Sequence, residues 1–341
     1  MHEWRLPQQH NLSKDLFHGG NPPPKVHLRC SASGANLHSA RSQLVQALYF
    51  SRDPFDAANA ETLDAGYPHS GLRSSFVRSV LQSFKPLLWL EVGAFIGNSA
   101  VMTAAVAAHL CMRDLSIVSI DPFTGDQMMW NLHRFAKLVD GEVAHRWGYD
   151  FLGLTKDGRP TIRDRYMANV LVSGAAPWVL PITAPGLVGM RLLKMMHTSK
   201  KLTTLPQVLF LDSAHEADET RLELEQSFKL LAPGGLLFGD DWSWEAVRND
   251  VTAFAAAAPS HTRFMHADES GPHREFVRAA ADNGLDCVWH LPAVLLCAPS
   301  VPGRDPAALA RPGVNESRWI TKAPFLLWAM IKRPTFHHLS E

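Results

Sequence analysis

The stretch Leu90-Glu91-Val92-Gly93-Ala94-Phe95-Ile96-Gly97-Asn98-Ser99-Ala100 decides the fold of this chain. It ends an apolar run and opens a helical pattern, the strand–turn–helix context that gives a glycine loop its meaning. Gly93 and Gly97 let the backbone turn sharply and approach a ligand, and the helix start offers free N–H groups. The spacing E-x-G-x-x-x-G lacks the third glycine of the dinucleotide fingerprint, which disfavours an NAD site. Plain tight packing of the turn is the alternative interpretation.

The chain around this loop alternates short apolar runs with helical patterns. Apolar runs without polar alternation indicate strands buried on both faces, as in a parallel sheet covered by helices. The sequence therefore predicts an α/β fold with a Rossmann-like doubly wound sheet. Its strands are expected at 87–93, 115–120, 178–182, 208–211 and 236–238, and its helices at about 42–50, 70–84, 98–110, 126–138, 161–171, 186–198, 217–231 and 244–257.

Two further apolar runs, 287–291 and 294–298, are separated only by Pro292-Ala293, so they must pair antiparallel. We expect a C-terminal hairpin on a mainly parallel sheet.

The boundaries predicted for the chain are a loose leader (1–40), an N-terminal helical cap (41–85), the main domain (86–300, with an insertion at about 124–176) and a C-terminal extension (301–341). The apolar stretch 319–331 is too short to span a bilayer. It is expected to be a docking helix, with membrane-surface contact as the alternative.

Composition and charge limit the classes of molecule that we expect this chain to bind. The formal net charge is zero, which gives no electrostatic footprint for nucleic acid. No run of apolar residues is long enough for a transmembrane helix. The four cysteines are scattered without a C-x-x-C pair, so neither disulfides nor a zinc site is expected. We therefore expect a small-molecule acceptor, a cytoplasmic location with organelle targeting left open, and a homo-oligomer as an open alternative.

Acidic residues follow three of the predicted strands. Asp121 ends the second strand, where an acid can accept hydrogen bonds from both hydroxyls of a ribose. Asp212 follows the fourth strand, and Asp240 and Asp241 follow the fifth. If those two strands are neighbours, the three carboxylates converge and repel unless a cation or protons neutralise them. An all-oxygen set suits Mg²⁺. Capping of the helix at 244–257 is the alternative role for Asp240 and Asp241.

A histidine follows Asp212 by three residues, and several acidic residues lie in the helix predicted after it. An imidazole is suited to take a hydroxyl proton, so His215 is a candidate general base, although one histidine among seventeen is weak evidence by itself. The simplest interpretation of Glu219, Glu223 and Glu225 is the solvated face of a helix. Trp242 and Trp244 either wall an acceptor site or pack in the core. The aromatic-rich insertion is predicted to be a lid or acceptor pocket, or equally a dimerisation arm.

These motifs carry a resemblance to a known family. Glu91–Ala100 resembles the first motif of class I S-adenosylmethionine (SAM)-dependent methyltransferases, especially the catechol O-methyltransferase-like group. Asp212–Trp242 is similar to the TylF-like macrocin O-methyltransferases and the cephalosporin hydroxylase-like family grouped with them. The resemblance covers about residues 70–300. It implies SAM binding by Glu91, Gly93, Ala94, Gly97, Asn98, Ser99, Asp121 and Asp212. It also implies Mg²⁺ binding by Asp212, Asp240 and Asp241, with Asp212 and His215 as catalytic residues.

Three functions compete on this basis. The first is metal-assisted O-methylation of a small-molecule hydroxyl, of a sugar or natural-product type, with His215 as the base. The second is a hydroxylase-like or non-catalytic SAM-binding subunit. The third, an NAD-dependent oxidoreductase, is disfavoured by the glycine spacing and the terminal hairpin. The complete set of Asp212, His215, Asp240 and Asp241 favours the first, because a binding module has no use for a base beside a metal.

Overall fold

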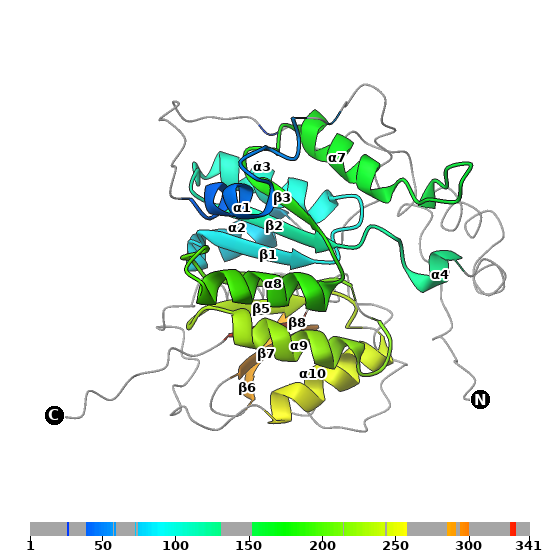
Figure 1. The fold of residues 1–341 in the computed structure, drawn as a ribbon. Helices are drawn as coiled ribbons and strands as arrows, with labels where there is room; N and C mark the ends of the chain where they lie inside the picture. The colour runs from blue at the N-terminus through cyan, green and yellow to red at the C-terminus, as the bar shows by residue number, and fades with distance from the viewer. Residues whose placement is uncertain are drawn as a thin grey trace.

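A computed structural model of the chain describes residues 26, 39–56, 58, 72, 74–130, 152–213, 215–242, 244–257, 285–290, 294–299 and 328–331. Within these residues one sheet has the strand order β3-β2-β1-β4-β5-β8-β7-β6 (Figure 1). The parallel strands are β1 (Leu88–Val92), β2 (Ser116–Asp121), β3 (Val179–Thr183), β4 (Val208–Leu211) and β5 (Leu236–Gly239). The antiparallel strands are β6 (Leu285–His290), β7 (Val294–Pro299) and β8 (Trp328–Ile331). The predicted α/β sheet with its C-terminal hairpin is confirmed.

The C-terminal segment corrects one prediction. Trp328–Ile331 is a strand that pairs antiparallel with β5 and separates it from the hairpin. The docking helix predicted over 319–331 is therefore wrong for these four residues, and the remainder lies outside the described part of the chain. A short apolar run has no periodicity that separates strand from helix, so only the free edge of β5 decides its conformation.

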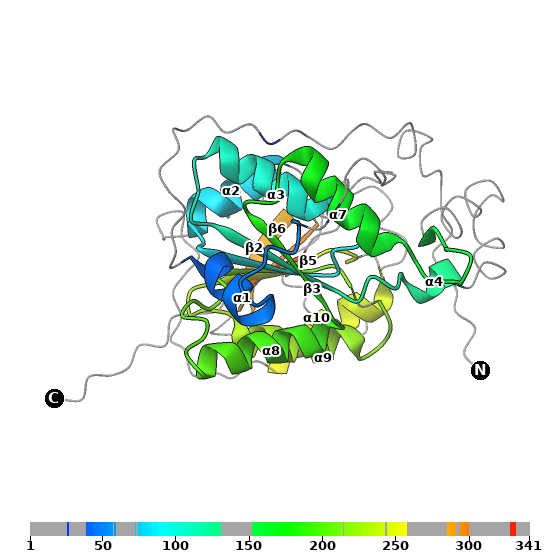
Figure 2. The same ribbon diagram turned by 45° about the horizontal axis from the view of Figure 1, so that its top comes forward.

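The helices form a layer on each face of the sheet (Figure 2). One face carries α2 (Ser74–Phe84), α3 (Asn98–His109) and α7 (Ile162–Ser173), whose apolar residues pack with Trp89, Phe210 and Phe238. The other face carries α1 (Ala40–Leu48), α8 (Gly186–Thr198), α9 (Glu219–Leu230) and α10 (Glu245–Ala257). Successive strand residues enter opposite layers, which is why the strands read as unbroken apolar runs.

The N-terminal helices and the insertion were predicted only in part. The two helices expected before the first strand are present as α1 and α2, and they cover opposite faces of the sheet. In the insertion, α4 covers Gln127–Trp130, and the rest of the helix predicted over 126–138 lies outside the described residues. No helix among the described residues is long and apolar enough to cross a membrane.

Cys111, directly after α3, contradicts the expectation that the chain has no disulfide. It is disulfide-bonded. Spacing along the chain does not report which cysteines meet in space. Because structural disulfides are rare in reducing compartments, the bond removes the support that cysteine usage gave to a cytoplasmic location.

The register of the parallel strands sets the position of the site. Val92 pairs with Ile120 and Leu211, and Leu211 pairs with Gly239. The carboxyl ends of β1, β2, β4 and β5 are therefore level, and their loops leave from the same edge of the sheet. This is the edge where doubly wound sheets bind ligands.

Candidate functional site

The glycine loop touches the end of β4. Gly93 has a left-handed backbone with φ of 88° and donates its N–H to Ile120 at 2.9 Å. A Cβ at this position would lie 2.0 Å from the carbonyl oxygen of Asp212, closer than any side chain allows. The Asp212 N–H in turn donates to the Val92 carbonyl at 2.8 Å. The predicted cofactor loop and the first predicted metal ligand are therefore in direct backbone contact.

The second glycine starts α3. Gly97 also has a left-handed backbone, with φ of 87°, and a Cβ there would lie 2.9 Å from the Tyr166 ring of α7. No side chain caps the helix at Gly97. This arrangement suits a helix start whose N–H groups face a bound molecule. The loop between the glycines includes Phe95, which has a positive φ of 46°.

Glu91 supports the loop from inside the core. Its side chain is buried, and its carboxylate accepts hydrogen bonds from the hydroxyls of Ser99 and Ser119, the latter at 2.9 Å. Burial raises the pKa of Glu91 from 4.5 to about 7, against the opposing effect of the two hydroxyls. Glu91 thereby joins β1 and β2 to the first turn of α3.

Asp121 ties the loop to the end of β2. Its carboxylate accepts the backbone N–H of Phe95 at 2.8 Å and that of Phe123. Burial raises the pKa of Asp121, while these N–H groups and that of Ala94 act in the opposite direction. Each carboxylate oxygen has a second lone pair, so these bonds leave capacity to accept from a ribose hydroxyl. Binding of a nucleoside by Asp121 stays a prediction.

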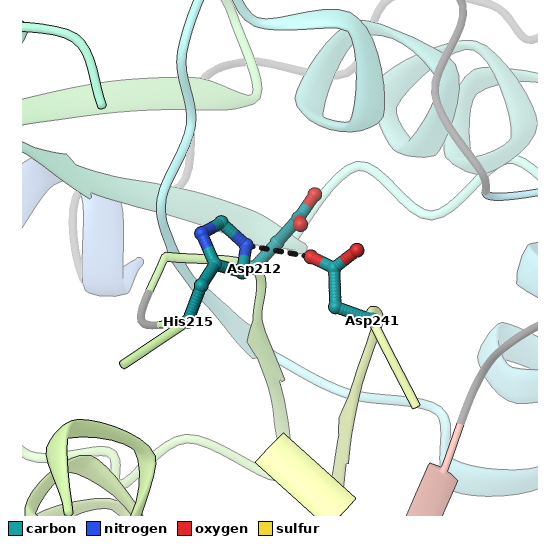
Figure 3. A group of neighbouring side chains, drawn as sticks. All are labelled: Asp212, His215 and Asp241. Carbon is teal, nitrogen blue, oxygen red and sulfur yellow. Dashed lines mark hydrogen bonds and ion pairs between the residues drawn. The ribbon is translucent and has the colours of Figure 1, made fainter. Parts of the chain in front are cut away.

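The strand ends bring an aspartate–histidine–aspartate group together. One ligand atom each from Asp212, His215 and Asp241 lies within 4.8 Å of the others, and Figure 3 shows the imidazole facing the Asp241 carboxylate with Asp212 beside them. Asp240 is not in this group, and its carboxylate accepts the Asp241 backbone N–H at 2.8 Å. Of the three predicted metal ligands, Asp212 and Asp241 lie in this group together with His215.

His215 is held on both ring nitrogens. Nε2 is 2.6 Å from the Asp241 carboxylate and Nδ1 is 3.2 Å from that of Asp126. The ring stacks on Trp244 with centroids 5.2 Å apart. Burial alone would lower the pKa of His215, but the two carboxylates outweigh it and raise the pKa well above 6.5. When protonated, the ring donates from both nitrogens and has no lone pair with which to take a proton.

The aspartates repel one another. Burial is the largest cause that raises the pKa of Asp212 well above 3.8, followed by the charges of Asp240 and Asp241. Burial and the charge of Asp241 raise the pKa of Asp240 to about 7. A divalent cation would relieve this repulsion, and the donor set of two carboxylates and an imidazole fits one. The residues present therefore fit a metal.

A cavity of about 220 Å³ opens beside the histidine, lined by Gly125, Asp126, Ser213, His215, Glu216, Glu219 and Trp244. Trp244 is thus a wall of the cavity, whereas Trp242 is buried in the core below. Gly125 and Asp126 begin the insertion, so the described part of that segment contributes to the pocket. Asp126 gave no signal in the sequence, because no motif or periodicity marks its position.

Glu223 contradicts the expectation of a solvated helix face. It is only 8% exposed, and its carboxylate accepts the Ser213 hydroxyl at 2.6 Å. Burial raises its pKa to about 7. Glu219 is exposed and Glu225 is partly exposed, as predicted. Glu223 instead faces inward and fixes the loop between Asp212 and His215.

Comparison with known proteins agrees with this geometry. Residues 90–242 match a family model described as a methyltransferase domain, and the predicted class of enzyme is confirmed at that level. No curated protein matches the chain. Among solved structures, an O-methyltransferase from Bacillus cereus in complex with SAH is 13% identical, with 87% of this chain and 98% of that chain covered and a TM-score of 0.36.

A second solved structure is similar at the same level. The O-methyltransferase TomG from Streptomyces achromogenes, in complex with SAM, is 11% identical, with 86% of this chain and 89% of that chain covered and a TM-score of 0.35. Similarities this low add nothing to what the strand order of this chain already shows.

Replacing Gly93 with alanine tests the contact between the glycine loop and β4. We expect Gly93→Ala to lower the melting temperature strongly, because the new methyl group meets the Asp212 carbonyl and the loop must move. Gly158→Ala is the matched control, since Gly158 has a similar φ of 80° but nothing lies within 4 Å of the place that its methyl group would take. Equal losses of melting temperature in the two variants would show that only the backbone conformation matters.

The buried Glu91 predicts a pH-dependent stability difference. The folded state holds the Glu91 proton up to a pKa of about 7, whereas the unfolded chain releases it near 4.5. The folded state therefore binds more protons between these values, and stability falls as pH rises through this window. Relative to Glu91→Gln, the wild type should lose about 3 kcal/mol of unfolding free energy between pH 4.5 and 7. Urea unfolding of both proteins across this range measures it, and a constant difference contradicts it.

Proposed function

We propose that this chain is a SAM-dependent methyltransferase that methylates a hydroxyl group of a small molecule, of a sugar or natural-product type, with the help of a divalent metal. The observation that carries the proposal is the backbone contact between Gly93 and Asp212. It joins a glycine loop suited to the methyl donor to an acidic group suited to a metal, so donor and acceptor would meet at one edge of the sheet.

Donor binding is assigned to the glycine loop and the end of β2. The helix start at Gly97 faces the same edge as Asp121, whose carboxylate retains capacity to accept hydrogen bonds from a ribose. Glu91 is assigned a supporting role through Ser99, because its carboxylate is buried beneath the loop. SAM supplies the methyl group on a sulfonium, so alignment of donor and acceptor accounts for much of the rate.

The metal is assigned to Asp212 and Asp241, with Asp240 or His215 completing the set. The two carboxylates already share one place, and their mutual repulsion gives a cation a favourable interaction. A bound divalent cation would lower the pKa of the acceptor hydroxyl and orient its oxygen. An all-aspartate set suits Mg²⁺, whereas a set that includes His215 suits a metal that accepts nitrogen.

His215 is assigned as the general base, and a divalent cation would be held by Asp212 and Asp241. With the Nε2 proton lost to solvent, the neutral ring would have a lone pair on Nε2, while Asp126 accepts from Nδ1 and fixes the ring. The acceptor hydroxyl would give its proton to Nε2 while its oxygen forms a bond to the methyl carbon. The bond from that carbon to the sulfur of SAM would break and leave S-adenosylhomocysteine. The cavity beside His215 and Trp244 is assigned to the acceptor.

Calorimetric titration with SAM and with Mg²⁺ or Mn²⁺ tests the proposal. We expect wild type to bind both, and Asp241→Asn to lose metal affinity while SAM affinity is unchanged, because Asp241 lies outside the glycine loop. Asp157→Asn is the control, since Asp157 is exposed, pairs with Arg159 two residues away and does not line the cavity. Absence of SAM binding in the wild type contradicts the proposal. SAM binding without any metal binding favours the alternative, a hydroxylase-like or non-catalytic SAM-binding subunit.

The metal affinity of His215→Ala separates a base from a ligand. If His215 is the base, its removal frees Asp241 from the imidazolium, and Mn²⁺ should bind at least as tightly as in wild type. If His215 is a ligand, the affinity should fall by at least roughly 10- to 100-fold, the range for the loss of groups that only orient the ligands. Mn²⁺ titration followed by electron paramagnetic resonance measures the difference. A fall of that size would remove His215 from the role of base.

A further inference from the structure

The strand β8 brings the C-terminal segment into the sheet beside the acidic group. Trp328 pairs with Gly239, the last residue of β5, so the first residue of β8 lies opposite the residue that precedes Asp240. The Trp328 side chain is 1% exposed and packs in the same core layer as Trp242. No sequence motif in this segment indicated a part in the site.

The indole fits against Gly239 because that residue has no side chain. A Cβ on Gly239 would lie 2.3 Å from Cζ2 of Trp328, so the ring occupies the space that a methyl group would need. From this position the indole Nε1–H donates to the carbonyl oxygen of Asp240 at 3.1 Å. A buried indole N–H without a partner is costly, so this bond fixes the ring and the carbonyl together.

The bonded carbonyl belongs to the peptide unit that joins Asp240 to Asp241. The N–H of the same peptide unit donates to the Asp240 carboxylate at 2.8 Å. The unit is therefore held at both ends, by Trp328 on its oxygen and by Asp240 on its nitrogen. Asp241, directly after it, has a left-handed backbone with φ of 60°, a conformation that non-glycine residues rarely adopt. This conformation turns its carboxylate toward His215 and Asp212 (Figure 3).

We propose that Trp328 is a positioning residue for Asp241. By holding the carbonyl of the Asp240–Asp241 peptide unit, the indole from β8 keeps Asp241 in its left-handed conformation and its carboxylate in the aspartate–histidine–aspartate group. The strand β8, which pairs with β5 on the edge opposite β4, thus contributes a residue that orients the site. For its effect on metal binding this inference rests on the proposed function, whereas the orientation of the turn does not depend on a metal.

Trp328→Phe tests the hydrogen bond, because phenylalanine retains an aromatic ring and lacks the N–H. Met330→Leu is the matched control, since Met330 is buried on the same strand and in the same core layer as Trp328. We expect Trp328→Phe to weaken Mn²⁺ binding by about 10-fold, the lower end of the range for groups that orient metal ligands. SAM affinity should be unchanged in both variants, and Met330→Leu should keep the wild-type Mn²⁺ affinity.

Hydrogen exchange followed by mass spectrometry gives the readout that needs no metal. Trp328→Phe should raise amide exchange in the peptide that contains Asp240 and Asp241, and Met330→Leu should not. Unchanged exchange in that peptide together with unchanged Mn²⁺ affinity overturns the proposal. If the wild type binds no Mn²⁺, the proposed metal role fails, and exchange alone decides whether Trp328 positions the turn. If Trp328→Phe does not fold, ¹⁵N-tryptophan spectra of the wild type decide, and exchange of the Trp328 indole N–H with solvent as fast as that of a free indole overturns the proposal.

Discussion

The absence of a side chain at Gly93 is the constraint on which the rest of the site depends. The carbonyl oxygen of Asp212 occupies the space in which any other residue would place its Cβ, only 2.0 Å away. Backbone hydrogen bonds from Gly93 to Ile120 and from Asp212 to Val92 lock the same junction between three strands. The glycine loop and the aspartates therefore share one rigid edge, where small displacements of either would separate them.

Several buried carboxyl groups lie near that edge, and burial disfavours their ionised forms. Glu91, Asp121, Asp212, Asp240 and Glu223 all have raised pKa values, and burial is the largest cause for each. His215 faces Asp126 and Asp241 and supplies a positive charge when it is protonated. Protons, the imidazolium or a bound cation are the three ways to offset this repulsion. A ligand that supplies positive charge therefore binds the folded state preferentially and stabilises it.

Local patterns predicted the frame of the fold, whereas contacts between distant segments escaped prediction. The five parallel strands were expected within one or two residues of their observed bounds, because strands covered on both faces leave unbroken apolar runs. The convergence of Asp212 and Asp241 followed from the rule that ligands bind beyond the carboxyl ends of parallel strands. The strand at Trp328–Ile331, by contrast, is specified by the free edge of β5, which no local pattern reveals. The inward orientation of Glu223 and the contact of Asp126 with the histidine likewise depend on partners that linear spacing does not indicate.

The roles of the two halves of the site follow from the segments that build them. The donor side consists of the loop after β1 and the end of β2, both held by the central strands of the sheet. The acceptor side takes its floor from the turns after β4 and β5, and part of its wall from Gly125 and Asp126 at the start of the insertion. Because Asp126 also holds His215, the insertion affects both the shape of the pocket and the orientation of the proposed base. A change in the insertion would therefore alter acceptor choice and proton transfer together, while the donor loop would remain as it is.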